Sequence, residues 1–131
     1  MREAPANVKA RRLISSGSAF EPIVGYSRAV RVGEFVFVSG TVGDGADAYE
    51  QTKSAIAKIE QALHEAGASL DDVVRTRIYV TDIAAQWEDA GRAHSEAFRD
   101  ARPACSMLEV AALIRPEYLV EVEADAYLAA P

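Results

Sequence analysis

Residues 102–110 read RPACSMLEV, and residues 119–124 read LVEVEA. The second stretch alternates apolar and acidic side chains, which is typical of a strand with one buried face. Its valines share one face, and Glu121 and Glu123 share the other. The first stretch predicts another strand, and the two strands together should place the thiol of Cys105 and several carboxylates near one another.

The rest of the chain supplies the elements that pack around these strands. Apolar alternation and turn signals predict five strands in all, at residues 26–32, 35–39, 73–80, 105–111 and 118–127. Helical spacing predicts helices at residues 48–66 and 84–99. The order β-β-α-β-α-β-β predicts an α+β fold, with one mixed sheet and both helices on one face. The other face should meet solvent or another subunit.

The sequence predicts how both helices begin and which faces of the helices and of one strand are buried. Asp47 followed by Glu50 forms a capping pattern before the first helix, and Gly67 suits its end. Thr81 or Asp82 should cap the second helix. The buried stripe expected for the first helix consists of Thr52, Ala55, Ile56, Ile59, Ala62, Leu63 and Ala66. The second helix should bury Trp87, Gly91, His94 and Phe98. The strand at 73–80 should bury Val74, Thr76, Ile78 and Val80.

Composition limits the class of protein. The chain has 131 residues and a net charge of −6, and we expect a single domain over residues 1–131 with an arm at 1–22. Acidity argues against nucleic acid as a partner, because phosphate binding needs clustered Lys and Arg. No apolar run is long enough to cross a membrane. With one cysteine and no visible secretory segment, we expect a cytoplasmic protein.

The acidic face of the last strand has two interpretations. Arg75 and Arg77 form a cationic row on another strand, so cross-strand or intersubunit ion pairs explain most of these carboxylates. The other interpretation is that Glu121 borders a cleft and handles a proton or a water, since burial raises a carboxyl pKa towards the working range of an acid–base catalyst.

Other reactive side chains have simpler explanations. Tyr26 and Arg28 lie two apart and share a strand face, which suits an anionic ligand or an exposed sheet edge. Cys105 could be a nucleophile, but a lone cysteine is more often a small buried apolar residue. His94 on the apolar stripe favours a core or interface histidine, and His64 should be solvated. The glycine-rich loop at 39–45 lacks the Lys-Ser/Thr ending of a P-loop. No His and Cys spacing indicates a metal site.

The chain resembles the Rid/YjgF family over residues 17–127. The resemblance is carried by short segments in a characteristic order, at residues 25–26, 38–40, 50–52, 80–82, 95–98, 102–104 and 121–124. It implies a chorismate mutase-like fold of the bacillary type, a homotrimer, and ligand clefts between subunits.

The resemblance also implies a reaction without metal or organic cofactor. In deaminating members an arginine grips the carboxylate of a 2-imino acid, and a glutamate matching Glu121 activates water, so that ammonia and a 2-oxo acid are released. Tyr26 and Ser39 match cleft-lining positions. Here Cys105 occupies the place of the arginine, and Arg92 occupies a place that often holds asparagine.

A thiol cannot replace the two-pronged contact of a guanidinium with a carboxylate. The usual 2-imino acid deaminase activity is therefore expected to be weak or absent, unless Arg28 or Arg92 supplies a relocated cation. The leading interpretation is a small-molecule cleft that hydrolyses another imine or enamine. One alternative is a non-catalytic metabolite-binding trimer. The other is an endoribonuclease, which the negative net charge of the chain argues against.

Overall fold

A single mixed sheet of six strands is the centre of the computed structural model, which describes residues 10–129. The strand order is β1-β2-β3-β6-β4-β5, and only β4 and β5 pair in parallel. The strands are β1 (Arg11–Ile14), β2 (Ala29–Val32), β3 (Phe35–Val42), β4 (Val73–Thr81), β5 (Ala104–Val110) and β6 (Val120–Tyr127). No helix in the described part of the chain is long and apolar enough to span a membrane.

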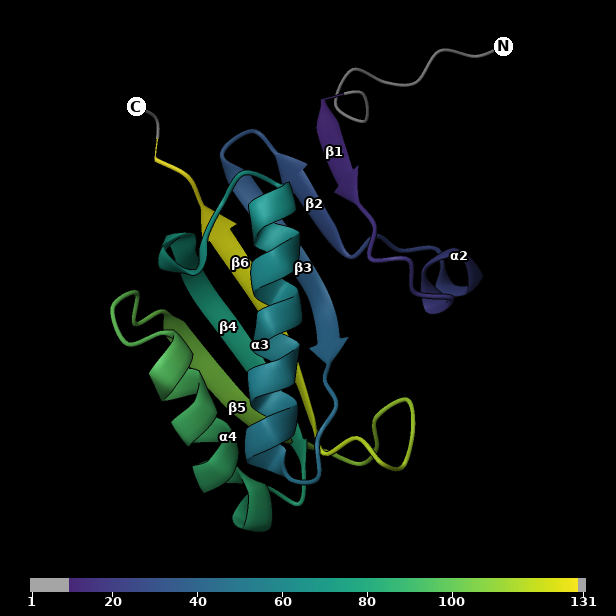
Figure 1. The fold of residues 1–131 in the computed structure, drawn as a ribbon, viewed down its shortest axis with the longest axis vertical. Coiled ribbons are helices and arrows are strands. Elements are labelled where there is room, and N and C mark those ends of the chain that lie inside the picture. The colour runs from purple at the N-terminus through teal and green to yellow at the C-terminus, as the bar shows by residue number, and fades with distance from the viewer. Residues whose placement is uncertain (1–9, 130–131) are drawn as a thin grey trace.

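The two long helices lie side by side on one face of the sheet (Figure 1). They are α3 (Ala48–Glu65) and α4 (Ile83–Ala97), and a short 3₁₀ helix, η1 (Leu70–Asp72), precedes β4. A further short helix, α2 (Phe20–Val24), stands to the side of the sheet after β1 (Figure 1). The expected α+β fold, with both long helices on one face, is confirmed.

The first long helix forms as its sequence predicts. The Asp47 side chain accepts a hydrogen bond from the backbone N–H of Glu50 at 2.8 Å, and the helix stops before Gly67, whose φ is 87°. A left-handed φ at this place favours glycine. Every member of the predicted stripe is buried: Thr52, Ala55, Ile56, Ile59, Ala62, Leu63 and Ala66.

Strand β6 lies at the middle of the sheet and supplies its densest packing. Val120, Val122, Ala124 and Ala126 are all 0% exposed beneath the helices. Because successive side chains alternate between faces, the carboxylates of this strand must lie on the face that no long helix covers. The predicted alternation is confirmed.

Two predictions about buried faces are wrong. A register shift against β6 between Val73 and Arg75 turns Val74 outward, where it is 50% exposed, and buries Val73 instead. Trp87 is 53% exposed, because α4 packs through its smaller residues Ala90 and Ala93.

The start of α4 also differs from its prediction. Asp82 makes no side-chain cap bond and has a φ of 52°. Glu109 of β5 caps the helix instead, since its Oε1 accepts from the Ile83 N–H at 2.9 Å. A partner 26 residues away is invisible to a local capping rule.

Residues 10–22 of the predicted N-terminal arm include a strand and the start of a helix. Residues 1–9 of the predicted arm lie outside the described residues, and β1, which lies within the arm, pairs with β2. Helix α2 was not predicted. Strand β2 starts three residues later than expected, and β3 runs on to Val42 through an irregularity between Val38 and Thr41.

Candidate functional site

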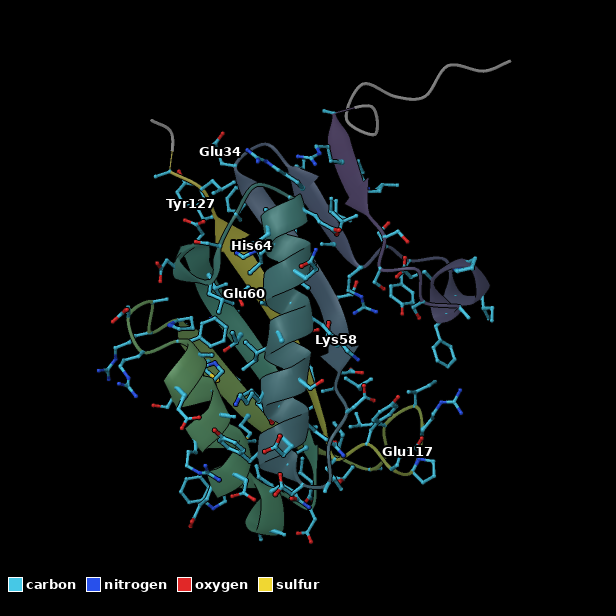
Figure 2. The ribbon with its side chains drawn as sticks, in the orientation of Figure 1. Glu34, Lys58, Glu60, His64, Glu117 and Tyr127 are labelled. Atoms are coloured by element: carbon cyan, nitrogen blue, oxygen red, sulfur yellow. The ribbon has the colours of Figure 1, made fainter. Side chains whose placement is uncertain are left out.

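A cleft of about 960 Å³ opens beside the end of β3 that extends past β2. Its walls come from the segment around α2, from β3 and β6, from one flank of α3, and from the loop that precedes β6. Lys58 projects from α3 towards this region, and Glu117 lies on the loop (Figure 2). The polar side chains that line the cleft include Tyr26, Arg28, Ser39, Lys58, Glu121 and Glu123.

Arg28 is the best-anchored cation of the cleft. Its Nη1 donates to the Gly40 carbonyl and to Thr41 Oγ1, both at 2.8 Å, and its Nη2 donates to the Tyr26 hydroxyl at 3.1 Å. Its guanidinium also lies 5.5 Å from the centre of the Tyr26 ring. A guanidinium has five N–H donors. The described residues account for three of them, so two remain for a ligand.

The irregular end of β3 creates these acceptors. Thr41 Oγ1 donates to the Ser39 carbonyl at 2.8 Å, and Ser39 Oγ donates to the Ser27 carbonyl at 2.6 Å. The strand thus aims both a carbonyl and a hydroxyl at Arg28. A regular strand would commit the Gly40 carbonyl to a neighbouring strand.

Glu121 is on β6, which lies between β3 and β4. It is in register with Val42 of β3 and with Tyr79 of β4. Burial of the carboxyl group raises the pKa of Glu121, the negative charge of Glu123 raises it further, and Arg28 opposes the change. A carboxyl group with a raised pKa is a better proton donor and acceptor near neutral pH.

A buried carboxylate fixes the outer wall of the cleft. Glu21 of α2 is 6% exposed, and its carboxylate accepts from Ser15 Oγ at 2.8 Å, from Ser16 N–H at 3.0 Å and from Ser16 Oγ at 2.5 Å. The backbone N–H groups of Gly25 and Tyr26 donate to the Glu21 carbonyl. One residue therefore joins the segment that follows β1 to the segment that precedes β2. The bond from the Ser16 hydroxyl is the largest influence on the pKa of Glu21, which is lowered.

The remaining carboxylates of β6 are mostly in ion pairs. Arg77 Nη1 lies 3.3 Å from both Glu123 and Asp125, and the Tyr79 hydroxyl donates to Glu123 at 2.9 Å. The predicted cross-strand pairing is confirmed for these residues. Among residues 10–129, Arg75 is in register with Asp125 but forms no ion pair.

Two of the six predicted site residues lie away from the cleft. Arg92 is on α4, where its guanidinium lies 3.8 Å from the centre of the Tyr49 ring and 3.5 Å from Asp89. Cys105 is exposed on β5, the edge strand, in register with Thr76. Within one chain the fold brings together Tyr26, Arg28, Ser39 and Glu121, and leaves Arg92 and Cys105 apart.

The two histidines behave as expected. His94 Nε2 lies 2.8 Å from Thr76 Oγ1, its ring lies 4.6 Å from that of Phe98, and burial lowers the pKa of His94. It is a packed histidine with a polar partner. His64 is exposed on α3 (Figure 2). No group of three or more potential metal ligands occurs within the described ranges.

Sequence reasoning did not find the wall or its carboxylate. The signal was present as Ser15, Ser16 and Ser18 followed by Glu21 within six residues, since such side chains bond locally. Lys58 was missed because an exposed lysine on a helix has no distinguishing pattern.

Comparison with known proteins gives one consistent result. The family described as Endoribonuclease L-PSP matches residues 16–128. The chain is similar to the crystal structure of Rv2704 from Mycobacterium tuberculosis, a member of the YjgF/YER057c/UK114 family, with 58% identity and a TM-score of 0.88. That match covers 90% of this chain and 99% of Rv2704. The chain belongs to the Rid/YjgF family.

Two further proteins are similar to this Rid/YjgF protein. A RutC family protein of Pyrococcus abyssi is 38% identical over 126 residues, which cover 90% of this chain and 98% of that protein. A putative endoribonuclease of Thermotoga maritima is 28% identical, with a TM-score of 0.76, and the match covers 90% of this chain and 93% of that one. The resemblance seen in the sequence is confirmed, and so is the chorismate mutase-like fold that it implied.

Proposed function

We propose that this Rid/YjgF protein binds a small metabolite in the cleft and hydrolyses its imine or enamine to a carbonyl product and ammonia. The observation that carries the proposal is the position of Glu121, a half-buried carboxyl group of raised pKa in the same cleft as Arg28. A carboxylate that holds water near a cationic anchor suits addition of water to a polarised C=N bond.

The chemistry balances without a cofactor. Glu121 takes a proton from water as the water oxygen bonds to the carbon of the protonated imine, which gives a neutral carbinolamine. Glu121 then gives this proton to nitrogen. As the C–N bond breaks and the C=O bond forms, the hydroxyl proton passes to Glu121 and ammonia leaves. An enamine enters the same sequence after protonation at carbon. Tyr26 and Ser39 would orient the substrate through their hydroxyl groups.

The anchor of the substrate is assigned to Arg28 and not to Arg92. Arg28 lines the cleft and keeps two free N–H donors, whereas Arg92 is held against Tyr49 on α4. Arg28 cannot move far towards a ligand, because three acceptors hold it. We therefore keep the expectation that 2-imino acid deaminase activity is weak when Cys105 stands at the family's arginine position.

The site is proposed to be completed in a homotrimer. The sheet face that no long helix covers carries exposed apolar side chains, including Phe35 at 47%, Phe37 at 44% and Tyr127 at 44%. Their rings contact one another, with centres 6.1 Å and 5.2 Å from Phe35. Such a patch favours association. A neighbouring edge strand would then bring its Cys105 towards the cleft. A single cysteine also suits the cytoplasm.

Ammonia release from freshly generated iminopropanoate tests the reaction. We expect low turnover by the wild-type protein, further loss in Glu121→Gln, and a gain in Cys105→Arg, with Arg92→Ala as the matched control. Strong wild-type turnover would show that the inference from Cys105 is wrong. Full activity in Glu121→Gln would remove this residue from the mechanism.

A non-catalytic metabolite-binding trimer is the second candidate, and the exposed thiol at residue 105 favours it because no cation stands there. Native mass spectrometry with a metabolite mixture separates the two, since this candidate predicts binding without turnover. Endoribonuclease activity is the third candidate, suggested by the names of relatives. A net charge of −6 opposes it. RNA cleavage that is lost in Glu121→Gln would support it.

A further inference from the structure

A buried amide near the start of α3 joins two loops of the fold. Gln51 is 4% exposed, and its Nε2 donates to the Gly45 carbonyl at 3.2 Å and to the Glu117 carbonyl at 3.0 Å. Its Oε1 accepts from the Leu119 N–H at 2.8 Å. A side-chain amide has two donor hydrogens and one acceptor oxygen, so all three groups are in use. Two of the bonds cross to the loop before β6 (residues 111–119), with partners 66 and 68 residues away.

The two loop partners of Gln51 flank a residue of the cleft. Glu117 and Leu119 lie on either side of Tyr118, which lines the cleft. Glu121 follows two residues after Leu119, on β6. The amide therefore holds the backbone on both sides of Tyr118, at the point where the chain enters β6.

Few other bonds hold this loop. Of the side chains between residues 10 and 129, only that of Gln51 forms hydrogen bonds with the loop before β6. The backbone adds one turn bond within the loop and one bond from the Thr81 N–H to the Leu119 carbonyl at 3.0 Å. A segment with few bonds opens locally at a low free-energy cost. Loss of the Gln51 amide should therefore release this loop before it affects the sheet.

The other side of the amide rests on a fixed base. A methyl group on Gly43 would clash with the backbone oxygen of Gln51 and with the backbone nitrogen of Ala55. A methyl group on Gly45 would lie 2.9 Å from the backbone nitrogen of Gln51. The glycine-rich loop thus packs directly on the backbone of α3, without room for side chains. Gln51 is held by this base and fixes the loop before β6 relative to the helix.

We propose that Gln51 is a positioning residue of the cleft, whose amide holds the loop before β6 so that Tyr118 faces the cleft and Glu121 stays half-buried beside it. Catalytic groups must be held within about 0.5 Å of their productive geometry, and hydrogen bonds from supporting residues do this. The effect of Gln51 on turnover rests on the proposed function. Its effect on the environment of Glu121 does not, and can be measured without any substrate.

Gln51→Met tests the substrate-free effect, because it keeps the length of the side chain but removes its donors and its strong acceptor. Amide exchange over residues 111–120 should accelerate about tenfold or more, since buried backbone groups of the loop lose their partners. The carboxyl titration of Glu121, followed by NMR, should move down towards 4.5 as water reaches the group, because burial is the main cause of its raised pKa.

Turnover is measured with freshly generated iminopropanoate, in the wild-type protein and in the Cys105→Arg background. Adding Gln51→Met should lower kcat about tenfold or more, since a misplaced catalytic group loses much of its effect. KM should change less, because no hydrogen bond of Gln51 reaches Arg28. The acid limb of the rate profile should move to lower pH together with the titration of Glu121.

Thr52→Val is the matched control. Thr52 is the neighbour of Gln51 on α3, is 0% exposed, and donates through Oγ1 to the Ala48 carbonyl at 2.7 Å. This change removes one buried hydrogen bond that does not reach the loop before β6. It should lower the melting temperature and leave loop exchange, the titration of Glu121 and kcat unchanged. Equal shifts of the Glu121 titration in Thr52→Val and Gln51→Met would overturn the proposal.

Gln51→Glu keeps the proposal testable if Gln51→Met does not fold. An ionised carboxyl group only accepts hydrogen bonds, whereas a neutral one has one donor and one acceptor. Loop exchange relative to the wild type should therefore be fast at about pH 8 and recover in part towards about pH 5, as the new carboxyl group is protonated. Fast exchange that does not recover in acid would overturn the role of the amide donor.

The remaining outcomes separate this proposal from the proposed reaction. An unchanged titration of Glu121 in both Gln51 variants overturns the proposal, whatever happens to turnover. A shifted titration with full turnover also overturns it. A shifted titration with no ammonia release from the wild-type or Cys105→Arg protein supports the role of Gln51 and removes the reaction.

Discussion

A methyl group on Gly40 would lie 2.7 Å from Oε2 of Glu121 and 2.9 Å from its Cδ. The backbone of β3 thus packs directly against the carboxyl group that the proposed reaction uses. Gly40 lies in the irregular part of β3. The Gly40 carbonyl also accepts a hydrogen bond from Arg28 at 2.8 Å. One glycine therefore sets the position of both the acid and the cation of the cleft.

Gly40→Ala should damage function more than folding. The atoms that the new methyl group meets belong to the far end of the Glu121 side chain, which can rotate away. We expect turnover to fall tenfold or more, because a displacement of about 1 Å can cost about a hundredfold. The melting temperature should change little. Unchanged turnover would show that the carboxyl position is not critical.

Gly91→Ala is the matched control for that change. Nothing lies within 4 Å of a methyl group added at Gly91, which is in the interior of α4. Replacing a helical glycine by alanine should stabilise the fold by about 0.5–1 kcal/mol. Denaturant unfolding measures this gain. Destabilisation by Gly91→Ala would indicate that the flank of α4 contacts another surface in solution.

Glu121→Gln should change the pH dependence of stability in a defined direction. The folded pKa of Glu121 is raised above its ordinary value of 4.5, so in the window above 4.5 the folded state binds more protons than the unfolded state. Wild-type stability therefore falls as pH rises through this window, and the loss is complete above the folded pKa. Glu121→Gln should be relatively stabilised at neutral pH, and this advantage should disappear below pH 4.5.

The same group should appear in the rate profile. If Glu121 accepts a proton from water, activity falls on the acid side with an apparent pKa above 4.5. Glu34→Gln, at an exposed turn, is the control for the loss of one carboxylate. An acid limb that stays in Glu121→Gln would assign the titration to another group.

The fold was predictable where one element's own periodicity decides its burial. The alternation of apolar and acidic side chains around Glu121 and the buried apolar stripe of α3 could be predicted without knowing which elements pack beside them. Val74 was misplaced because a register shift against β6 is a property of two strands. Trp87 was misplaced because close packing by Ala90 and Ala93 overrode the larger apolar side chain. In both cases tertiary contacts decided between faces that the sequence left nearly equivalent.

The candidate site was predictable only where its residues lie close together in the sequence. Tyr26 and Arg28 lie two apart, and their hydrogen bond of 3.1 Å follows from that spacing. Their meeting with Glu121 needed the sheet order, which places β6 beside β3. Cys105 lies two strands from Glu121 in that order, so a single chain cannot unite them. Sequence likeness alone had grouped residues that belong, on our proposal, to different subunits.

Glu21→Gln should loosen the outer wall of the cleft. The change keeps the shape but removes the charge that three donors from Ser15 and Ser16 stabilise. Hydrogen bonds to a charged group are each worth about 1.5–3 kcal/mol. Amide exchange should accelerate over residues 15–26 and stay unchanged in α3, with weaker ligand binding. Glu34→Gln is the control.

The pH dependence of the same wall has the opposite sign to that of Glu121. The folded pKa of Glu21 is lowered, so its contribution to stability is present above 4.5 and is lost as pH falls through the folded pKa. Exchange over residues 15–26 should therefore accelerate in acid in the wild-type protein but not in Glu21→Gln. Identical acid responses in the two proteins would assign the wall's stability to its backbone bonds.

His94 should make the protein sensitive to mild acid. Burial lowers the folded pKa of His94 below 6.5, so as pH falls from 6.5 the unfolded state takes up a proton that the folded state does not, and stability declines until the folded pKa is reached. His94→Gln should reduce this decline, and His64→Gln, at an exposed position, is the control for the loss of one histidine. Thr76→Val should cost about 1–3 kcal/mol, because it removes the hydroxyl 2.8 Å from His94 Nε2 and leaves a half-buried ring nitrogen without its partner. Chemical denaturation at pH 5 to 8 measures all three, and an unaltered acid decline in His94→Gln would contradict the assignment.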